Sequence, residues 1–292
     1  MIGDFIQSWA LFKDSYMVGW SMAVLLSMVG VLVIARDQVF IGAAVSQASM
    51  FGIALSIALE QALGLAAISW FDPSLFHSMV GGAFAILASL VTARAGGSRS
   101  MESPGAITGW VFLLGAAGSV LAVARNPHGM EEVQQLLSSS IIGATAVDLW
   151  GCFALTGITM AVLVLLQRRI LLLVMDREMA GAVGMRVGRW EAGICIWLGL
   201  AIGLSIHVGG MTFTFGCLVL PALIAKNLCS EVRQILLVAP CIALLSTVLS
   251  FVLANSLDLP PGQVAVGLLA ILLAAVWALR YVLAFLRPRP QG

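Results

Sequence analysis

Long apolar runs, each about as long as a bilayer-spanning helix, divide this chain along its whole length. A helix needs about 20 residues to cross a hydrocarbon core of roughly 30 Å. Of the 292 residues, 61% are hydrophobic and 10% are charged, whereas about a quarter of the residues in a soluble domain are charged. No segment alternates polar and apolar residues as a barrel strand does, so the spans are expected to be helices. The predicted runs are 17–35, 39–59, 75–93, 105–124, 147–166, 191–207, 211–228, 235–254 and 263–285.

These runs predict an all-α polytopic membrane protein with eight to nine transmembrane helices, in which residues 1–292 form a single transmembrane domain. The seventh run leaves the number open, because Val208-Gly209-Gly210 gives little room for a reversal after the sixth run. The seventh run is either a full span or a broken or re-entrant helix. The first run is expected to be retained, since Asp4 and Lys13 make no basic segment before it, unlike in a signal peptide.

Basic residues collect in alternate loops, which sets the expected orientation, because cytoplasmic loops are enriched in Lys and Arg. With nine spans, this pattern places the N-terminus outside and the C-terminus inside. Only Lys13 and Arg125 fall on the opposite side. The side predicted to be cytoplasmic carries Arg36, Arg94, Arg99, Lys226, Arg233, Arg280, Arg287, Arg289 and the five arginines of residues 167–190.

Several functional classes find no support in the residues. No basic cluster with interleaved aromatic residues indicates nucleic-acid binding. The five cysteines show no C-x-x-C spacing and are expected to be reduced and buried. An intramembrane enzyme would need a buried catalytic pair, and an ion-coupled secondary transporter would show internal repeats and membrane-embedded acids. Neither pattern is evident in the sequence, although the secondary transporter is kept as an alternative.

Residues 167–190 form a charged island that holds five of the fifteen basic residues. Within it, Asp176 is a good N-cap and Gly184 a good C-terminal stop, so a two-turn helix is predicted over 176–183. Its apolar residues recur every four positions, at Met175, Met179, Val183 and Val187. The island is therefore either an interfacial helix lying on lipid headgroups or a cytoplasmic knob for a groove on a partner protein.

Four motifs resemble the permease subunits of ATP-binding-cassette importers for zinc, manganese and iron. The pattern D-x-E-x-A-x-x-x-G of that family's coupling helix stands here as DREMAGAVG, residues 176–184. Residues 209–225 look like its G-x-L-L-V-x-A-L-L-x-x-P-A-x-x-A run, and 258–262 resemble D-x-P-[ST]-G with Pro261 at the fourth position. Residues 36–52 are similar to R-x-x-x-x-G-D-A-x-x-H-A-x-x-x-G. All four motifs occur in the order in which the family has them.

The resemblance implies a transport subunit that is not itself an enzyme and binds no cofactor of its own. Two ATPase subunits, a second permease copy in a homodimer or heterodimer, and an extracytoplasmic substrate-binding protein would be its partners in a bacterial plasma (inner) membrane. The sequence holds no G-x-x-x-x-G-K-[ST], so a partner must hydrolyse ATP. The coupling contact would be made by Asp176, Arg177, Glu178, Met179, Ala180, Val183 and Gly184.

The second span departs from the family where a ligand would be expected. The family's Asp and His, four residues apart on one helical face, look like a transient ligand pair for a divalent cation. Here they are Ala43 and Gln47, and neither is an effective metal ligand. A family Asp before the fourth span aligns roughly with Ser103, next to Glu102. No metal site is therefore assigned from the sequence.

Other polar residues in the spans are candidates for the transport pathway. Each also has an ordinary structural explanation, such as hydration or core packing. His77 and His128 are expected to have no ligand role, and Met50 and Met211 are expected mainly to pack. The candidate pathway residues are Ser46, Gln47, Ser49, Glu60 and His207.

Three explanations for the missing ligand pair stay open. A second, different permease would supply the ligands in a heterodimer. Alternatively, the cargo is a metal chelate or another small solute and not a bare ion. Finally, a weakly polar path around Gln47 would suffice, because transport requires weak binding.

Overall fold

The computed structural model describes the chain except residues 1, 64–72, 96–102, 125–140, 145 and 287–292. Every regular element in the described residues is helical, which confirms the all-α prediction. The elements are α1 (Ile2–Ala35), α2 (Ile41–Leu63), α3 (Pro73–Ala95), α4 (Pro104–Val123), the 3₁₀ turn η2 (Ile141–Gly143), α6 (Ala146–Met175), α7 (Arg177–Ala182), α8 (Val187–Leu228), α9 (Val232–Leu257) and α10 (Pro261–Leu286).

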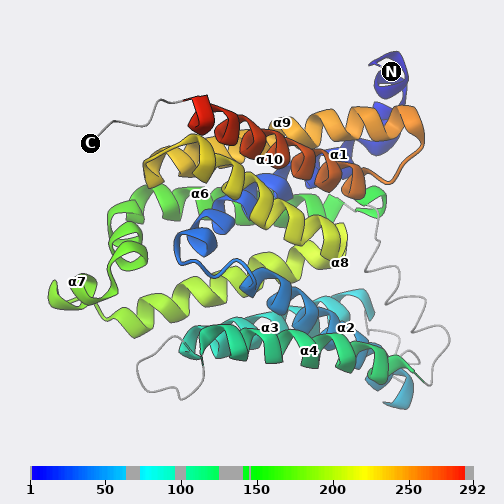
Figure 1. Cartoon of the computed structure of the whole chain (residues 1–292). Coiled ribbons are helices and arrows are strands. Elements are labelled where there is room, and N and C mark those ends of the chain that lie inside the picture. The colour runs from blue at the N-terminus through cyan, green and yellow to red at the C-terminus, as the bar shows by residue number, and fades with distance from the viewer. Residues whose placement is uncertain (1, 64–72, 96–102, 125–140, 145, 287–292) are drawn as a thin grey trace.

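Eight of the described helices are long and apolar enough to cross a bilayer. One of them, α8, is 42 residues long and contains the predicted sixth and seventh runs. Its backbone leaves the helical region at Gly210, with φ 75° and ψ 171°. Figure 1 shows the chain reversing direction there, so that α8 consists of two arms, 187–209 and 211–228, each close to the roughly 20 residues of a full span. The seventh run is thus the second arm of a sharply bent helix, and the described part of the chain has nine segments of about spanning length.

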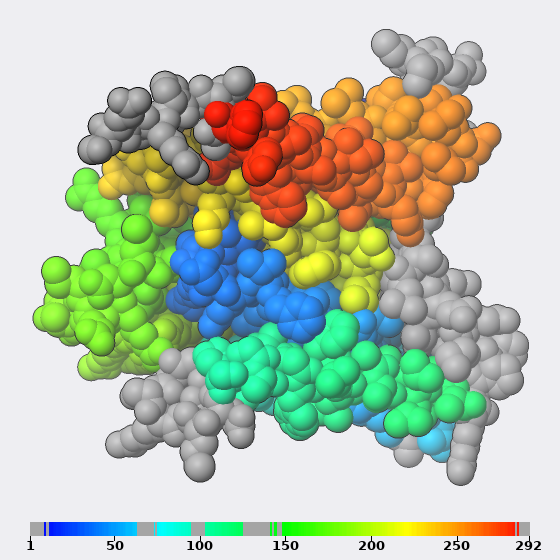
Figure 2. Space-filling model, in the orientation of Figure 1, coloured from blue at the N-terminus to red at the C-terminus, as the bar shows by residue number. Residues whose placement is uncertain are grey.

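The helices differ strongly in how much of their surface the chain itself covers. In the apolar windows of α1 and α2, 83% of the residues are buried, and in α8 72% are, against 28% or less in α3, α4, α6 and α10. Figures 1 and 2 show α3 and α4 on one side of the molecule and α9 and α10 on the other, with α1 between them and α2 packed against α3 and α4. The outer helices therefore present most of their apolar side chains to lipid or to partner chains.

Small residues let the interior helices approach one another closely, as is common in membranes. A Cβ atom on Gly115 of α4 would collide with the backbone of Gln47 in α2, and one on Gly203 of α8 would meet the backbone of Gly82 in α3. The first contact fixes α2, which carries most of the candidate pathway residues, against α4, and the second fixes the first arm of α8 against α3.

The helix ends fall into two groups. Figure 1 places the ends of α1, α3, α6, α8 and α10 at the end of the molecule that carries α7. These ends hold or adjoin the basic residues predicted to be cytoplasmic, including Arg36, Arg94, Lys226 and Arg280. The bend at Gly210 lies at the opposite end. The arrangement is the one expected from nine spans with the N-terminus outside.

Candidate functional site

A short helix, α7, stands apart from the bundle at its basic end (Figure 1). Its N-cap is Asp176, whose carboxylate accepts a hydrogen bond of 2.8 Å from the backbone N–H of Met179. Glu178 in the first turn adds a negative charge where the helix dipole favours one. Asp176 is thus the N-cap that the sequence predicted, and the helix itself begins at Arg177.

The C-terminus of α7 closes with a Schellman motif. Met185 donates from its backbone N–H to the carbonyl of Ala180 at 3.1 Å, and Gly184 donates to the carbonyl of Gly181 at 3.0 Å. Gly184 has φ 87°, a left-handed conformation that glycine adopts without steric cost. Gly184 is therefore a genuine stop, and the helix ends one residue before the predicted Val183.

The two faces of α7 differ in exposure. Ala180 is fully buried, whereas Met179 is 53% and Val183 67% exposed. On the side facing α8, Arg177 forms an ion pair of 2.9 Å with Glu191, which holds α7 against the start of that helix. The helix is thereby fixed in place with Met179 and Val183 both exposed, as a contact surface for a partner requires.

Gln47 is buried within the bundle, in the helix where the resemblance places a metal-ligand pair. Its side-chain Nε2 donates to the Sδ of Met211, at 3.2 Å, just after the bend in α8. Ala43, one turn earlier, is 5% exposed. At this level the structure offers an amide and a thioether where the family pattern has a carboxylate and an imidazole, and neither is a good ligand for a hard divalent ion.

Ser46 and Ser49 are fully buried. The hydroxyl oxygens of both lack a hydrogen-bond partner among the described residues, as do those of Ser205 and Thr214 in the two arms of α8. A buried hydroxyl without a partner loses free energy unless water or a ligand satisfies it. These hydroxyls on α2 and α8 can therefore form hydrogen bonds with water or a ligand in the interior of the bundle.

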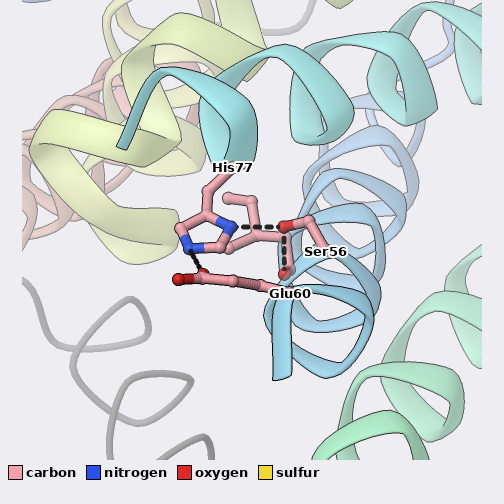
Figure 3. Close-up of polar contacts among 4 residues, drawn as sticks. Ser56, Glu60 and His77 are labelled. Carbon is pink, nitrogen blue, oxygen red and sulfur yellow. Dashed lines mark hydrogen bonds and ion pairs between the residues drawn. The ribbon is translucent and has the colours of Figure 1, made fainter. Parts of the chain in front are cut away.

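Glu60 belongs to a polar cluster at the outer ends of α2 and α3 that the sequence did not predict. The Nε2 atom of His77 lies 3.0 Å from a carboxylate oxygen of Glu60, and its Nδ1 lies 2.7 Å from the hydroxyl of Ser56. Figure 3 shows the imidazole held between the two side chains. His77 thus has a structural partner, and its position in the first turn of the next helix on the same membrane side was the available signal.

The Ser56 hydroxyl lies between the imidazole and the backbone of its own helix, because its oxygen is also 2.6 Å from the carbonyl oxygen of Ile53. The Nε2 atom of His77 faces the Glu60 carboxylate on the other side of the ring. The three side chains therefore form one chain of polar contacts that links α2 to α3.

His207 lies near the outer end of the first arm of α8 and is half-buried. Among the described residues no group of three or more His, Cys, Asp or Glu side chains is placed to hold a metal ion. Ser103 is the N-cap of α4, accepting from the backbone N–H of Ala106 at 3.2 Å. Glu102 and His128 lie outside the described residues, and each predicted pathway residue stays a candidate.

A bundle of spanning helices with a separately capped helix at its basic end defines a membrane-embedded transport subunit. The chain matches the ABC 3 transport family over residues 8–280 and belongs to that family.

Curated relatives of the chain are distant in sequence. The manganese import system permease protein ScaB of Streptococcus gordonii is 22% identical over 267 residues, covering 90% of each chain. A probable metal transport system membrane protein of Chlamydia trachomatis is 24% identical over 182 residues, and this match spans only 61% of that relative's length.

Solved structures share the fold over nearly the whole chain. PsaBC from Streptococcus pneumoniae in complex with Fab has a TM-score of 0.78 at 17% identity, covering 95% of each chain. An inward-facing putative metal-chelate type ABC transporter has a TM-score of 0.72 at 16% identity, covering 96% of this chain and 89% of that one.

Proposed function

We propose that this chain is the membrane-spanning permease subunit of an ATP-driven importer for a divalent transition metal. The observation that carries the proposal is α7, capped at both ends and presenting Met179 and Val183 from the basic end of the bundle. Curated relatives of similar length are named as manganese import permeases, and another, YfeD of Yersinia pestis, as a chelated iron transport system membrane protein. Zinc, manganese and iron therefore remain the candidate cargoes.

In this proposal the chain works by alternating access. Two ATPase subunits close on ATP and push α7, and this movement passes to the bundle through α6 and α8, which flank α7. Two permeases, identical or different, pack together in the inner membrane of a bacterium, and an extracytoplasmic protein delivers the cargo. The permease itself supplies no nucleotide site.

The test replaces the exposed apolar pair by Met179→Glu with Val183→Glu. Burying two carboxylates in an apolar groove carries a large desolvation cost, so co-purification with the ATPase should be lost while membrane insertion is retained. Met179→Leu with Val183→Leu keeps the apolar surface and should retain the ATPase. Leu228→Glu, which changes a residue 57% exposed at the same end of the bundle, is the second control. Unchanged co-purification of the double-Glu variant would remove the assignment of α7 as the coupling helix.

A metal chelate is a second candidate cargo, favoured by the side chains found at Ala43 and Gln47. An amide bound to a thioether is suited to a solute that brings its own metal ligands, because such a solute needs only weak polar contacts from the path. Reconstituted importer should then accumulate ⁵⁵Fe supplied as a chelate but not as the free ion. Accumulation of free Mn²⁺ or Zn²⁺ without a chelator would exclude this alternative.

A further inference from the structure

A cavity of about 850 Å³ opens between α1, α6 and the first arm of α8 near α7. Its volume is in the range of small-molecule sites, roughly 300–1,000 Å³. The rim is formed by four arginines, Arg168 and Arg169 from the end of α6 and Arg186 and Arg189 from the start of α8. None of the residues that line the cavity is acidic.

The positive charge at this rim has no acidic partner in the described part of the chain. None of the four guanidinium groups forms a hydrogen bond or an ion pair with a described residue, whereas nearby Arg177 is paired with Glu191. A fifth arginine, Arg36, lies beside a small neighbouring cavity that shares Val29, Leu32 and Ile194 with the larger one. Its Nη2 atom is buried without a partner among the described residues. These unpaired guanidinium groups would therefore stabilise a bound anion.

Below the rim the cavity is apolar and reaches into the membrane. Its walls include Val29 and Leu32 of α1 and Leu163 of α6, and its inner end is closed where Trp197 donates from Nε1 to the hydroxyl of Thr159 at 2.8 Å. Thr159 and Arg168 are nine residues apart on α6, a distance of roughly 13 Å along a helix. The cavity thus extends over much of one leaflet of a hydrocarbon core that is roughly 30 Å thick.

We infer that this cavity binds an anionic phospholipid of the cytoplasmic leaflet, with the phosphate at the arginine rim and an acyl chain along the apolar walls. Basic pockets between membrane helices on the cytoplasmic side suit anionic headgroups. A soluble phosphate compound would pair with the arginines but leave the apolar part of the cavity below the rim unfilled. A docked ATPase can reach the rim but not the part of the cavity at membrane depth. The lipid is the occupant that matches both parts.

The site would place a lipid next to the coupling helix. Val183, Gly184 and Met185, which directly follow α7, also line the cavity. A bound lipid would therefore contact both membrane-spanning walls and the C-terminus of α7.

The test is native mass spectrometry of the purified full-length chain, incubated with phosphatidylglycerol or with phosphatidylcholine of the same acyl chains. We expect selective retention of phosphatidylglycerol, weakened roughly thirtyfold by Arg186→Gln with Arg189→Gln, since each basic residue near an anionic surface contributes about fivefold. Arg186→Lys with Arg189→Lys should retain most of the binding. The matched control, Arg94→Gln with Arg233→Gln, removes two exposed arginines at the same end but outside the cavity and should change nothing.

A second measurement locates the lipid within the chain. Brominated phosphatidylglycerol at low mole fraction in phosphatidylcholine nanodiscs should quench tryptophan fluorescence, and Trp190→Phe should reduce the quenched fraction, because Trp190 lines the cavity. Equal retention of the two lipids, or undiminished retention by the Arg186/Arg189 glutamine variant, would overturn the proposal. Full competition by millimolar inorganic phosphate would reassign the site to a soluble phosphate compound. Displacement of the lipid by the bound ATPase subunit would reassign the rim to that interface.

Discussion

The polar pair of Glu60 and His77 joins the outer ends of two helices that otherwise pack through apolar and small residues. Both side chains are 15% exposed, so water screens the pair less than it does at an open surface. The hydroxyl of Ser56 lies 2.7 Å from the second ring nitrogen and fixes the orientation of the imidazole. The cluster therefore contributes to the packing of α2 on α3 whatever the cargo is.

A double-mutant cycle with Glu60→Gln and His77→Gln measures this pair. We expect a coupling free energy of about 1 kcal/mol, since charge-assisted hydrogen bonds exceed exposed ion pairs, which contribute about 0.2–1 kcal/mol. Denaturant or thermal unfolding of the purified chain in detergent supplies the four stabilities. The matched control is the cycle on Lys226 and Asp37, whose atoms lie 3.4 Å apart with side chains 50% and 89% exposed, where coupling near zero is expected. Equal coupling in both cycles would contradict the assignment of a largely buried hydrogen-bonded pair.

At the residue scale the sequence predicted less than it did for the helices. Gln47 was recognised as a departure from the family pattern, yet its contact with Met211 depends on the bend in α8, which no local pattern encodes. His77 was expected to have no ligand role because it is a lone histidine next to a loop. Its partner, Glu60, is close only after two helices pack in antiparallel fashion. Side-chain contacts between spans depend on how the helices pack, and a single sequence predicts that packing poorly.

At the scale of elements, α7 shows what local chemistry can specify. Its N-cap and its glycine stop were both predicted from residues 176–184, and the helix in the structure begins and ends within one residue of the predicted bounds. The cavity between α1, α6 and α8 could not be predicted from the sequence, because it is formed where these helices leave a gap between them. Caps follow from nearest neighbours along the chain, whereas cavities follow from the angles between helices.

Two glycine substitutions in and beside α7 should act in opposite directions. Gly184→Ala places a side chain at φ 87° and should destabilise the end of the helix by about 1–2 kcal/mol. Gly181→Ala is the matched control, because its Cβ would meet only Val187, at an ordinary 3.8 Å, and alanine favours a helix by about 1 kcal/mol over glycine. Hydrogen exchange of the amides in residues 177–186 should become faster in the first variant and slower in the second. Slower exchange in Gly184→Ala would contradict the left-handed stop.

At the scale of the whole molecule, the number of crossings depends on one residue. Gly210 has φ 75° and ψ 171°, a combination that is essentially restricted to glycine, and it lets the two arms of α8 run in opposite directions. The two arms make up one of the eight long apolar helices, because no polar loop separates them at the bend. The near-absence of a polar loop is why the sequence left the seventh run open.

Whether the number of membrane crossings is odd or even distinguishes nine crossings from eight. Nine crossings put the start of α1 and the end of α10 on opposite sides of the membrane, as their positions in Figure 1 require, whereas eight crossings would put them on the same side. Reporter tags at the two termini of the full chain should therefore respond oppositely to an impermeant probe.

Cysteine labelling tests the second arm of α8 directly, in two variants that each keep a single cysteine. In the first variant the substitution Thr212→Cys, next to the bend, provides that cysteine, which should react with impermeant maleimide from outside. Native Cys229, after the second arm, should react only once the membrane is opened. Reaction of both cysteines from one side would make the second arm re-entrant and reduce the crossings to eight, because an arm that crosses the membrane must separate its two ends by the full hydrocarbon thickness of roughly 30 Å.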